Sequence, residues 1–377
     1  MRFLFLATDF PPARGGIQTF SHELPRALVC KGHQVAVAAL AAPGAANWDA
    51  CLPFPVVRRS APFGKLGAIV ALRRGCLAAA RELAGPPDWL VAMKWMPEGP
   101  AAVLARRKLG CRLALVGHGR EFLPSGSRPV KRPVQRWVLR AADVALANSH
   151  YTAGNVVASG VPGERVRTIY CGVRPERYEV DEGGVQALRE RLGLAGKQVL
   201  LTAGRLVARK GHDVVIRALP QVLAQVPDVH YLMVGNGPEE DRLRSLARRH
   251  GVEDAVTICP DVPDEDMPSF FHLCDMFVMP SRDIPGAPIE GFGIVYLEAA
   301  ACAKPCVAGW SGGSPEAVRD GVTGLLVDPT DAEELCRAVL RLLSDPHAAA
   351  RLGAAGQQRV LDRFTWSHVA DRFLAAL

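Results

Sequence analysis

Two carboxylates, Glu290 and Glu298, stand eight residues apart on either side of the turn sequence Gly291-Phe292-Gly293. The two glycines allow a tight backbone turn with exposed N–H groups, and Glu298 falls about one turn into the helix predicted to follow. Amides and the positive end of a helix dipole favour a bound phosphate at such a position. A diphosphate with a sugar on each side would fit, with Glu290 reaching one sugar and Glu298 the other. The segment therefore predicts a nucleotide-sugar site.

A second candidate element is the loop 204–211, Gly-Arg-Leu-Val-Ala-Arg-Lys-Gly, which follows a predicted strand. Arg205 and Lys210 are five residues apart and could clamp the phosphates of a leaving nucleoside diphosphate. The negative charge of that group grows as the sugar bond breaks, so the two cations would stabilise the transition state most. A solvated basic loop is the alternative for an isolated pattern of this kind. Arg209 is interpreted as a surface charge.

Glycines at other predicted strand ends indicate further phosphate or nucleotide contacts. Gly15 and Gly16 precede a helix, and their exposed amides could approach a phosphate, although a plain turn is the alternative. Gly235 lies in Val-Gly-Asn-Gly-Pro, which follows another predicted strand and opens a helix. This sequence lacks the third glycine of a dinucleotide fingerprint, so it is poor support for NAD.

These motifs resemble those of the retaining glycosyltransferases of family 4, and the resemblance covers nearly the whole chain. Glu290 and Glu298 match the family's E-x7-E signature, and residues 204–211 match G-R-L-x-x-x-K-G. Phosphatidylinositol mannosyltransferases and related lipid-linked or polysaccharide transferases are the most similar group that we can place. The resemblance implies the GT-B fold, an α/β fold with two Rossmann-like domains facing across a cleft and a C-terminal helix crossing back to the first domain.

The resemblance also implies a role for each matching residue. Glu290 would hold the 3- and 4-hydroxyls of the donor sugar, while Arg205 and Lys210 carry the leaving charge. Glu298 would bind the ribose. The implied donor-binding set is completed by backbone or loop positions, with 261 and 262 at the base edge: Gly15, Gly16, Gly204, Gly235, Asp261, Val262, Phe292, Gly293 and Ile294.

His118 lies between two glycines at the end of a predicted strand of the first domain. A lone histidine is more often a bystander, but this one resembles the family's H-G-x-E element, which implies a contact with the donor sugar or the acceptor. Arg120 and Glu121 are expected to orient the acceptor, although Glu121 could only hold the loop. Gln18 is assigned to the acceptor, in a position where family members often have an acid.

The sequence predicts neither a metal nor a cofactor. The triplet Asp264-Glu265-Asp266 has the spacing of a divalent-cation motif, yet it precedes Met267-Pro268 and is interpreted as a capped helix N-terminus. The histidines form no ligand set with zinc spacing.

Apolar, β-branched runs alternate with helical patterns along the chain, which predicts two parallel sheets with covered faces. The pattern breaks near residues 174–184. We therefore predict a first domain of residues 1–178 with a crossing helix at 363–377, and a second domain of residues 179–362. The predicted strands are 3–7, 34–40, 89–93, 113–117, 144–148, 199–203, 229–234, 256–259, 276–280 and 305–308.

Composition and charge limit the class of protein. The chain has 377 residues, of which 49% are hydrophobic, and it shows no repeat, signal-peptide pattern or apolar run of membrane-spanning length. Ten scattered cysteines indicate reduced thiols and a cytoplasmic protein. Residues 1–180 hold 25 Lys and Arg against 11 Asp and Glu, so the first half would suit an anionic partner.

The prediction is a metal-independent retaining transferase that moves a hexosyl group, mannosyl or glucosyl, from an NDP-sugar to a hydroxyl of a lipid-linked glycan, glycolipid or polysaccharide. Transfer to a soluble sugar or sugar phosphate, a non-catalytic NDP-sugar binder and a basic nucleic-acid-binding module are the alternatives, and no nucleic-acid motif is found. The basic segments 64–77 and 128–140 could bind anionic lipid on the inner face of the cytoplasmic membrane, or form ordinary surface helices. The sequence does not set the oligomeric state.

Overall fold

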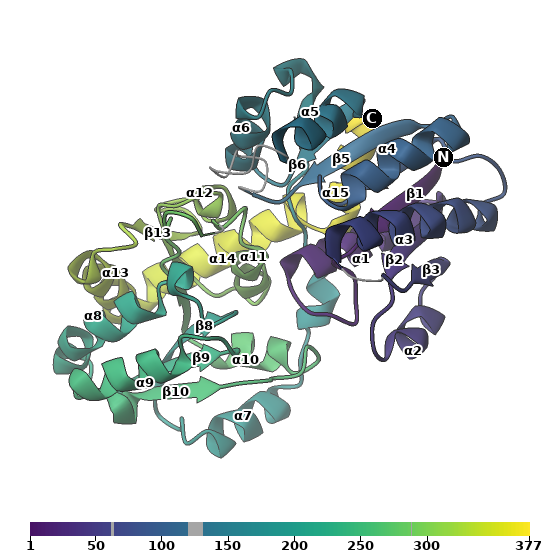
Figure 1. Cartoon of the computed structure of the whole chain (residues 1–377). Helices are drawn as coiled ribbons and strands as arrows, with labels where there is room; N and C mark the ends of the chain where they lie inside the picture. Colours follow the sequence, from purple (N-terminus) through teal and green to yellow (C-terminus); the bar gives the residue numbers. More distant parts are fainter. Residues whose placement is uncertain (62–63, 120–130, 288) are drawn as a thin grey trace. The chain divides into compact units, whose positions relative to one another are not determined.

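The computed structural model describes residues 1–61, 64–119, 131–287 and 289–377, which form two compact units (Figure 1). Unit 1 contains residues 1–171 and 366–377, and unit 2 contains residues 172–365. Both are parallel α/β sheets with flanking helices, so the predicted fold class is confirmed. Residues 172–178, which the sequence analysis placed in the first domain, pack with unit 2. In that segment the Val173 amide donates to the Phe364 carbonyl at 2.8 Å.

Unit 1 is built on a seven-stranded parallel sheet with strand order β3-β2-β1-β4-β5-β6-β7. Consecutive residues of a strand point to opposite faces, and most of its strands are apolar on both because helices cover both. The strands are β1 (Arg2–Ala7), β2 (Gln34–Leu40), β3 (Val56–Arg59), β4 (Trp89–Ala92), β5 (Arg112–Gly117), β6 (Val144–Ala147) and β7 (Val166–Thr168).

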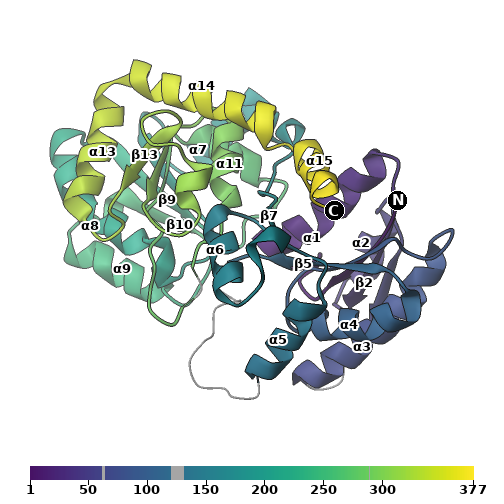
Figure 2. The ribbon, with the colours of Figure 1, turned by 90° about the horizontal axis from the view of Figure 1, so that it is seen from above.

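One face of the unit 1 sheet packs against α3, α4 and α5, whose apolar residues form a core with Leu4 and Leu6 of β1. These three helices lie side by side, since α4 contacts both α3 and α5 (Figure 2). The α-helices within residues 1–171 are α1 (Gly16–Cys30), α2 (Ala45–Ala50), α3 (Gly64–Ala79), α4 (Glu98–Leu109), α5 (Lys131–Ala141) and α6 (His150–Ala158).

The C-terminal helix α15 (Trp366–Ala376) belongs to unit 1, as predicted. It packs on α1 and on the other face of the sheet. The Phe373 ring lies 5.5 Å from Phe3 and 6.3 Å from Phe5 of β1, and the Trp366 ring lies 5.5 Å from Phe20. The last turns of the chain therefore complete the core of the first unit.

Unit 2 is built on a six-stranded parallel sheet with strand order β10-β9-β8-β11-β12-β13. Its first strand, β8, lies in the middle, so the chain leaves the sheet centre into the loop that carries Arg205 and Lys210. The strands are β8 (Gln198–Ala203), β9 (Val229–Val234), β10 (Val256–Cys259), β11 (Met276–Met279), β12 (Cys306–Gly309) and β13 (Gly324–Val327).

Helices cover both faces of the unit 2 sheet. On one face, α8, α9 and α13 bury an apolar core around Leu219, Tyr231 and Val339. On the other, the ring of Phe271 in α10 packs on Phe277 of β11 at 5.9 Å. The helices are α7 (Glu182–Arg191), α8 (His212–Gln225), α9 (Glu240–Arg249), α10 (Met267–Leu273), α11 (Ile294–Ala301), α12 (Ser314–Ala317), α13 (Ala332–Ser344) and α14 (Pro346–Arg363).

All ten predicted strands occur, with bounds that differ by no more than one residue at either end. Beyond those ten, the structure adds β13 at an edge of the unit 2 sheet and the short strands β3 and β7, which were not predicted. Strands β3 and β7 are the two edges of the unit 1 sheet, where an amphipathic sequence such as Val-Val-Arg-Arg suffices. All ten cysteines lie in the described part of the chain, and none of them is in a disulfide. Among the described helices, none combines the length and the apolar character that crossing a bilayer requires.

Candidate active site

Three loops meet where β8, β9 and β10 end in unit 2, and they approach so closely that only glycine fits. A Cβ atom on Gly235 would overlap the Gly204 carbonyl oxygen, and one on Gly237 would overlap that of Leu206. The Leu206 amide donates to the Asn236 carbonyl at 2.8 Å, and the Gly235 amide donates to that of Cys259 at 2.9 Å. The predicted residues Gly204 and Gly235 are therefore brought into contact.

The predicted base-edge segment lies at the end of β10. Asp261 has a positive φ of 54°, and its Oδ1 accepts from Asn236 Nδ2 at 2.6 Å. This side-chain contact holds the residue in a backbone conformation that non-glycine residues seldom adopt. The adjacent Val262 is half-buried. The ends of β9 and β10 thus carry a connected pair of loops beside the loop that follows β8.

Lys210 and Glu290, predicted from separate motifs, are in direct contact. Lys210 Nζ lies 2.6 Å from Glu290 Oε2, and Arg209 Nη1 lies 3.1 Å from the same oxygen. Arg209, interpreted from the sequence as a surface charge, is therefore part of this cluster, with a side chain that is 24% exposed. Burial alone would raise the pKa of Glu290, but the two cations outweigh it and lower the pKa. Glu290 is an ionised acceptor held between two positive charges.

Arg205 lies in the same loop as Lys210 but points to solvent. It is exposed, and among the described residues its guanidinium has no ion-pair partner. Its guanidinium is therefore available to an anion at the end of β8, as expected if Arg205 and Lys210 bind the phosphates together. The contact between Arg205 and a ligand stays a prediction.

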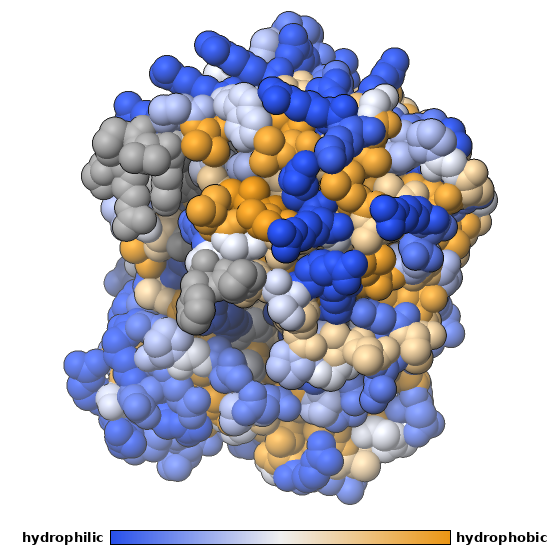
Figure 3. Space-filling model, turned by 45° about the vertical axis from the view of Figure 1, so that its right-hand side comes forward, coloured by the Kyte–Doolittle hydropathy of each residue, from blue (hydrophilic) through white to orange (hydrophobic). Residues whose placement is uncertain are grey.

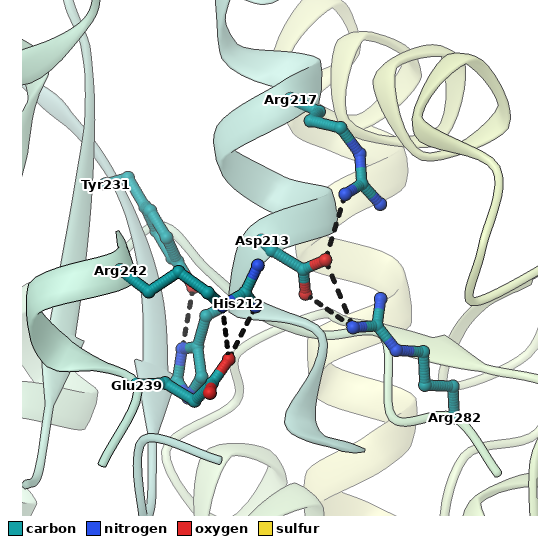
Figure 4. A network of polar contacts seen from close by, with 7 residues as sticks. All are labelled: His212, Asp213, Arg217, Tyr231, Glu239, Arg242 and Arg282. Atoms are coloured by element: carbon teal, nitrogen blue, oxygen red, sulfur yellow. Dashed lines mark hydrogen bonds and ion pairs between the residues drawn. The ribbon is translucent and has the colours of Figure 1, made fainter. Parts of the chain in front are cut away.

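A polar network behind the loop fixes its backbone (Figure 4). Asp213, at the start of α8, accepts from Arg282 Nη2 with both oxygens, at 2.9 and 3.1 Å, and also from Arg217. The Arg282 amide in turn donates to the Arg209 carbonyl at 2.9 Å. The buried charge of Asp213 is thus compensated, and the loop backbone is tied to the segment that follows β11.

A second buried chain lies beneath the first turn of α8. The Thr202 hydroxyl donates to the Val278 carbonyl and is hydrogen-bonded to the Tyr231 hydroxyl at 2.8 Å. The Tyr231 hydroxyl is also hydrogen-bonded to the His212 ring nitrogen Nδ1 at 3.1 Å (Figure 4). Burial lowers the pKa of His212 to about 4. His212 is therefore neutral near pH 7, and it joins the helix start to strands β8 and β9.

The Gly-Phe-Gly turn leads into α11 as predicted. Gly293 precedes the helix with a φ of 90°, and a Cβ there would lie 2.5 Å from the Tyr296 ring. No side chain caps this helix start, so its first amides remain open to a ligand. Ile294 is the first helical residue, while the Phe292 ring is buried and packs 5.8 Å from Phe364, which leaves only the Phe292 backbone for ligand contact.

Glu298 lies one turn into α11, and its pKa is raised mainly by burial. Tyr178 and Arg177 act against burial and lower this pKa, because both favour the charged form of the carboxyl group. Neither Tyr178 nor Arg177 was singled out from the sequence, since nothing in the segment Pro175–Tyr178 has a recognisable motif.

In unit 1, His118 lies just beyond β5, and its Nε2 donates to the Met93 carbonyl at 2.9 Å. Burial lowers its pKa to about 4, so the ring is neutral near pH 7. Its ring meets Phe20 of α1 edge to face at 5.3 Å. Arg120 and Glu121, the predicted acceptor residues that follow it, lie outside the described residues.

The predicted glycine pair of unit 1 begins α1. Gly15 has a φ of 146°, and the space that a Cβ would fill is occupied by Gln18, whose Oε1 would lie 2.6 Å away. Gln18 Nε2 reaches Asp9 Oδ1 at 3.5 Å, and Asp9 is ion-paired with Lys94. Gly16 is the first residue of the helix. The sequence analysis did not single out Asp9 and Lys94, which are the charged groups beside Gln18.

The Asp264-Glu265-Asp266 triplet lies before α10, as predicted, but the capping interpretation was wrong. Asp266 occupies the N-cap position without a side-chain hydrogen bond, and its backbone is already helical. The Asp264 carbonyl accepts from Arg177 Nη2 at 2.7 Å. Within the described residues, no group of three or more His, Cys, Asp or Glu side chains is arranged to hold a metal ion.

Two family descriptions match consecutive parts of the chain. Glycosyltransferase Family 4 matches residues 14–177, and Glycosyl transferases group 1 matches residues 185–359. Together these ranges contain the predicted site residues of both units.

Curated relatives extend the match to the whole chain. The GDP-mannose-dependent alpha-(1-6)-phosphatidylinositol monomannoside mannosyltransferase of Mycolicibacterium smegmatis is 37% identical over 367 residues, which cover 96% of this chain and 94% of that protein. The D-inositol 3-phosphate glycosyltransferase of Streptomyces bingchenggensis is 31% identical over 300 residues, or 76% of this chain and 63% of that protein. Both relatives are glycosyltransferases.

Solved structures share the GT-B arrangement of elements. HepE of Anabaena, crystallised in complex with UDP and glucose, has a TM-score of 0.83, 25% identity and complete coverage of both chains. Sucrose-phosphate synthase of Thermosynechococcus elongatus has a TM-score of 0.80 at 23% identity, with 99% of this chain and 97% of that one covered, and supports the fold alone.

Proposed function

The chain belongs to glycosyltransferase family 4, and from this membership we propose that it transfers a mannosyl group from GDP-mannose to a hydroxyl of a phosphatidylinositol-based glycolipid. The observation that carries the proposal is the contact of Glu290 with Lys210 and Arg209 beside an uncapped helix start. Similarity to a GDP-mannose-dependent phosphatidylinositol mannoside mannosyltransferase over 96% of the chain supports the donor and the acceptor.

In the proposed reaction, the bond between C1 of the sugar and the diphosphate breaks, and its electron pair goes to the diphosphate oxygen. The acceptor oxygen forms its bond to C1 on the same face, and its proton passes to a phosphate oxygen of the leaving group. The α configuration is then retained. Arg205 and Lys210 stabilise the growing negative charge, and Glu290 orients the sugar by accepting from its hydroxyls. These two cations supply the charge stabilisation, so we propose that the reaction needs no metal.

Residues of both units are assigned to the substrates in this proposal. His118 is neutral near pH 7 and would act as a hydrogen-bonding group toward a sugar hydroxyl rather than as a cation. Gly15 and Gly16 would meet the donor phosphate or the acceptor through their amides, and Gln18 would contact the acceptor. Glu298 would accept from the ribose.

The test is turnover with a panel of donors and acceptors, followed by mass spectrometry. GDP-mannose with a phosphatidylinositol mannoside should give a product heavier by one hexose, and EDTA should leave the rate unchanged. A second candidate, transfer to a soluble inositol phosphate, is favoured by the similarity to D-inositol 3-phosphate glycosyltransferases. Product from inositol 3-phosphate but not from the lipid would establish that candidate, and no product from any pair would refute both.

We propose in addition that unit 1 binds an anionic membrane surface through the outer side of α3, α4 and α5. The only acid in these three helices is Glu98, which is buried. Three large apolar side chains are exposed there, with Leu66 at 75%, Val70 at 43% and Leu104 at 37% exposure. The exposed cations of the three helices are Lys65, Arg74, Arg107, Lys108, Arg132, Arg136 and Arg140.

A surface of exposed cations and protruding apolar groups, without exposed acids, matches the chemistry of anionic lipid headgroups over acyl chains. Figure 3 shows apolar surface interspersed with long hydrophilic side chains on one face of the molecule. A glycolipid acceptor would be presented at such a surface. Residues 128–130 of the second basic segment lie outside the described residues.

Vesicle sedimentation tests this part of the proposal. The protein should bind phosphatidylglycerol vesicles at low salt and should not bind phosphatidylcholine vesicles. The double charge reversal Arg107→Glu/Lys108→Glu should weaken binding at least about tenfold, because each lost cation near the surface is worth about 1 kcal/mol. Arg248→Glu/Arg249→Glu is the matched control, an exposed pair in the last turn of α9 in unit 2. Equal effects of the two double variants would refute the assignment to this surface.

A further inference from the structure

The turn that carries Glu290 packs backbone against backbone on the loop that follows β12. The Gly313 amide donates to the Glu290 carbonyl at 3.0 Å. A Cβ atom on Gly312 would lie 2.2 Å from the Glu290 carbonyl oxygen, and one on Gly313 would lie 2.1 Å from the Gly291 carbonyl oxygen. Because no side chain separates the two segments at this point, a displacement of the two glycines also displaces the Glu290 backbone.

The short helix α12, which begins directly after Gly313, is held at its other end by Arg359 of α14. Arg359 Nη1 donates to the Ala317 carbonyl at 2.6 Å, and Arg359 Nη2 donates to the Glu316 carbonyl at 2.7 Å. Carbonyl groups in the last turn of a helix have no intrahelical partner and carry partial negative charge, which favours a cation at this end. The guanidinium therefore fixes α12 and, with it, the glycines that contact the Glu290 backbone.

Arg359 also supports the Glu290 turn through two aromatic rings. Its guanidinium carbon lies 4.7 Å from the centre of the Phe364 ring, and that ring lies 5.8 Å from the ring of Phe292 in the Gly-Phe-Gly turn. Both rings are buried. A cation over an aromatic face is attracted by the ring, and packed aromatic rings stabilise each other. The turn is thus held at its backbone through α12 and at its side chain through Phe364.

We infer that Arg359 is a positioning residue for the donor sugar, which acts by holding the turn that carries Glu290. The inference rests on the proposed function, in which Glu290 orients the sugar. Lys210 and Arg209 fix the carboxylate of Glu290, whereas the contacts of Arg359 lead to its backbone. Because turnover depends on an accurate fit between the carboxylate and the sugar hydroxyls, a small displacement of the turn should lower the rate.

Two donors that differ by one hydroxyl, GDP-mannose and GDP-4-deoxymannose, test the inference through the ratio of their kcat/KM values. The acceptor is a phosphatidylinositol mannoside. Wild type should prefer GDP-mannose, because Glu290 accepts from a hydroxyl that the analogue lacks. Arg359→Ala should lower kcat/KM for GDP-mannose about 10- to 100-fold and should lower it less for the analogue, so the preference shrinks. This ratio does not depend on how much of the variant is folded.

Two further variants complete the comparison. Arg359→Lys keeps the positive charge and a donor toward the α12 carbonyls, so it should recover part of the preference for GDP-mannose. Arg351→Ala is the matched control, because Arg351 is an exposed arginine of the same helix. This variant should keep the wild-type ratio.

Hydrogen exchange, followed by mass spectrometry without any donor, reports on the turn itself. In Arg359→Ala, amides of residues 289–297 and 311–318 should exchange faster than in wild type, while those of β8 should not change. Unchanged exchange of the turn would overturn the inference, and so would an equal loss of kcat/KM for both donors, which would indicate a general structural role. Failure of the wild-type protein to use either donor would instead overturn the proposed function, and the donor-sugar role of Arg359 with it.

Discussion

Lys210 Nζ lies 2.6 Å from Glu290 Oε2, although 79 residues separate the two in the chain. Arg209 is also ion-paired with Glu290 Oε2. Among the described residues, both ionic contacts of Glu290 therefore involve this one oxygen. The second oxygen can then accept from a sugar hydroxyl while the cations keep the group ionised. In the proposed reaction, the diphosphate would give Lys210 a second anionic partner.

We predict that Lys210→Ala and Glu290→Ala each lower kcat about 10²- to 10³-fold with GDP-mannose, because each removes charge or orientation in the transition state. The double variant should lose less than the product of the two effects, since the residues act as a unit. Initial rates of GDP release measure this. Lys197→Ala is the control, because Lys197 forms an exposed ion pair with Asp228 at 3.0 Å and should retain wild-type rates.

We predict that Arg209→Ala moves the acidic limb of the pH profile of kcat/KM to higher pH. Arg209 helps to lower the pKa of Glu290, so its removal raises that pKa, and a larger fraction of Glu290 is protonated in mild acid. Activity near pH 8 should change much less than activity near pH 5. Arg209→Lys, which keeps the charge, should restore most of the profile. An acidic limb that stays in place in Arg209→Ala would show that Arg209 does not control Glu290.

We predict that Gly211→Ala is far more damaging than Gly196→Ala. Both glycines have left-handed backbones, with φ of 77° and 72°. A Cβ on Gly196 meets nothing within 4 Å, whereas one on Gly211 would overlap the Pro280 carbonyl oxygen. Gly196→Ala should cost about 1 kcal/mol of unfolding free energy and leave turnover intact. Gly211→Ala should cost at least about 3 kcal/mol and displace Lys210. Urea denaturation and turnover assays measure these effects. Equal effects of the two variants would contradict the prediction, because they would show that the loop moves to accommodate the added Cβ.

We predict a loss of stability in mild acid that originates in both units. Burial lowers the pKa of His118 and of His212 to about 4, against about 6.5 in the unfolded chain. Between these values the unfolded state binds protons that the folded state does not. Each histidine then lowers the unfolding free energy by about 1.4 kcal/mol for each unit that the pH falls below 6.5.

Urea denaturation at pH 7 and at pH 5.5 tests this pH dependence. His118→Gln should be less sensitive to the pH change than wild type, because unit 1 then lacks one buried imidazole. His347→Gln is the control, since that side chain lies at the exposed start of α14. An equal pH sensitivity in all three proteins would contradict the assignment.

Much of the fold could be predicted because buried parallel strands have a simple sequence pattern. Runs such as Val229–Val234 are apolar throughout and are bounded by polar turns, so both their type and their limits are visible. The edge strand Val56–Arg59 was missed because one of its sides needs no cover, and its sequence looks like a loop. The boundary at residue 171 was also displaced, because residues 172–178 read as a linker although they pack into unit 2.

The sequence singled out Lys210 and Glu290 because a residue type and a local turn coincide there, and their contact with a substrate stays a prediction. Lys210 and Glu290 each lie beside glycines that restrict the backbone to a few conformations, so their neighbourhood could be anticipated. Arg209 was misassigned because adjacent loop cations look alike in a sequence, and only the loop geometry decides which of them turns inward. Tyr178 was not singled out because its ring packs on Phe271, which is distant in the chain, and no local pattern marks the segment Pro175–Tyr178.

The final helix gives the chain an unusual order of assembly. A ribosome makes the seven strands of unit 1 first, but Phe373, whose ring packs on Phe3 and Phe5, lies four residues before the chain ends. The first unit to be synthesised is thus the last to be completed, and the apolar surface that α15 covers stays exposed while the whole of the second unit is made. An expression fragment that stops at residue 171 would carry the same bare apolar face, and attaching residues 366–377 through a short linker should restore its solubility.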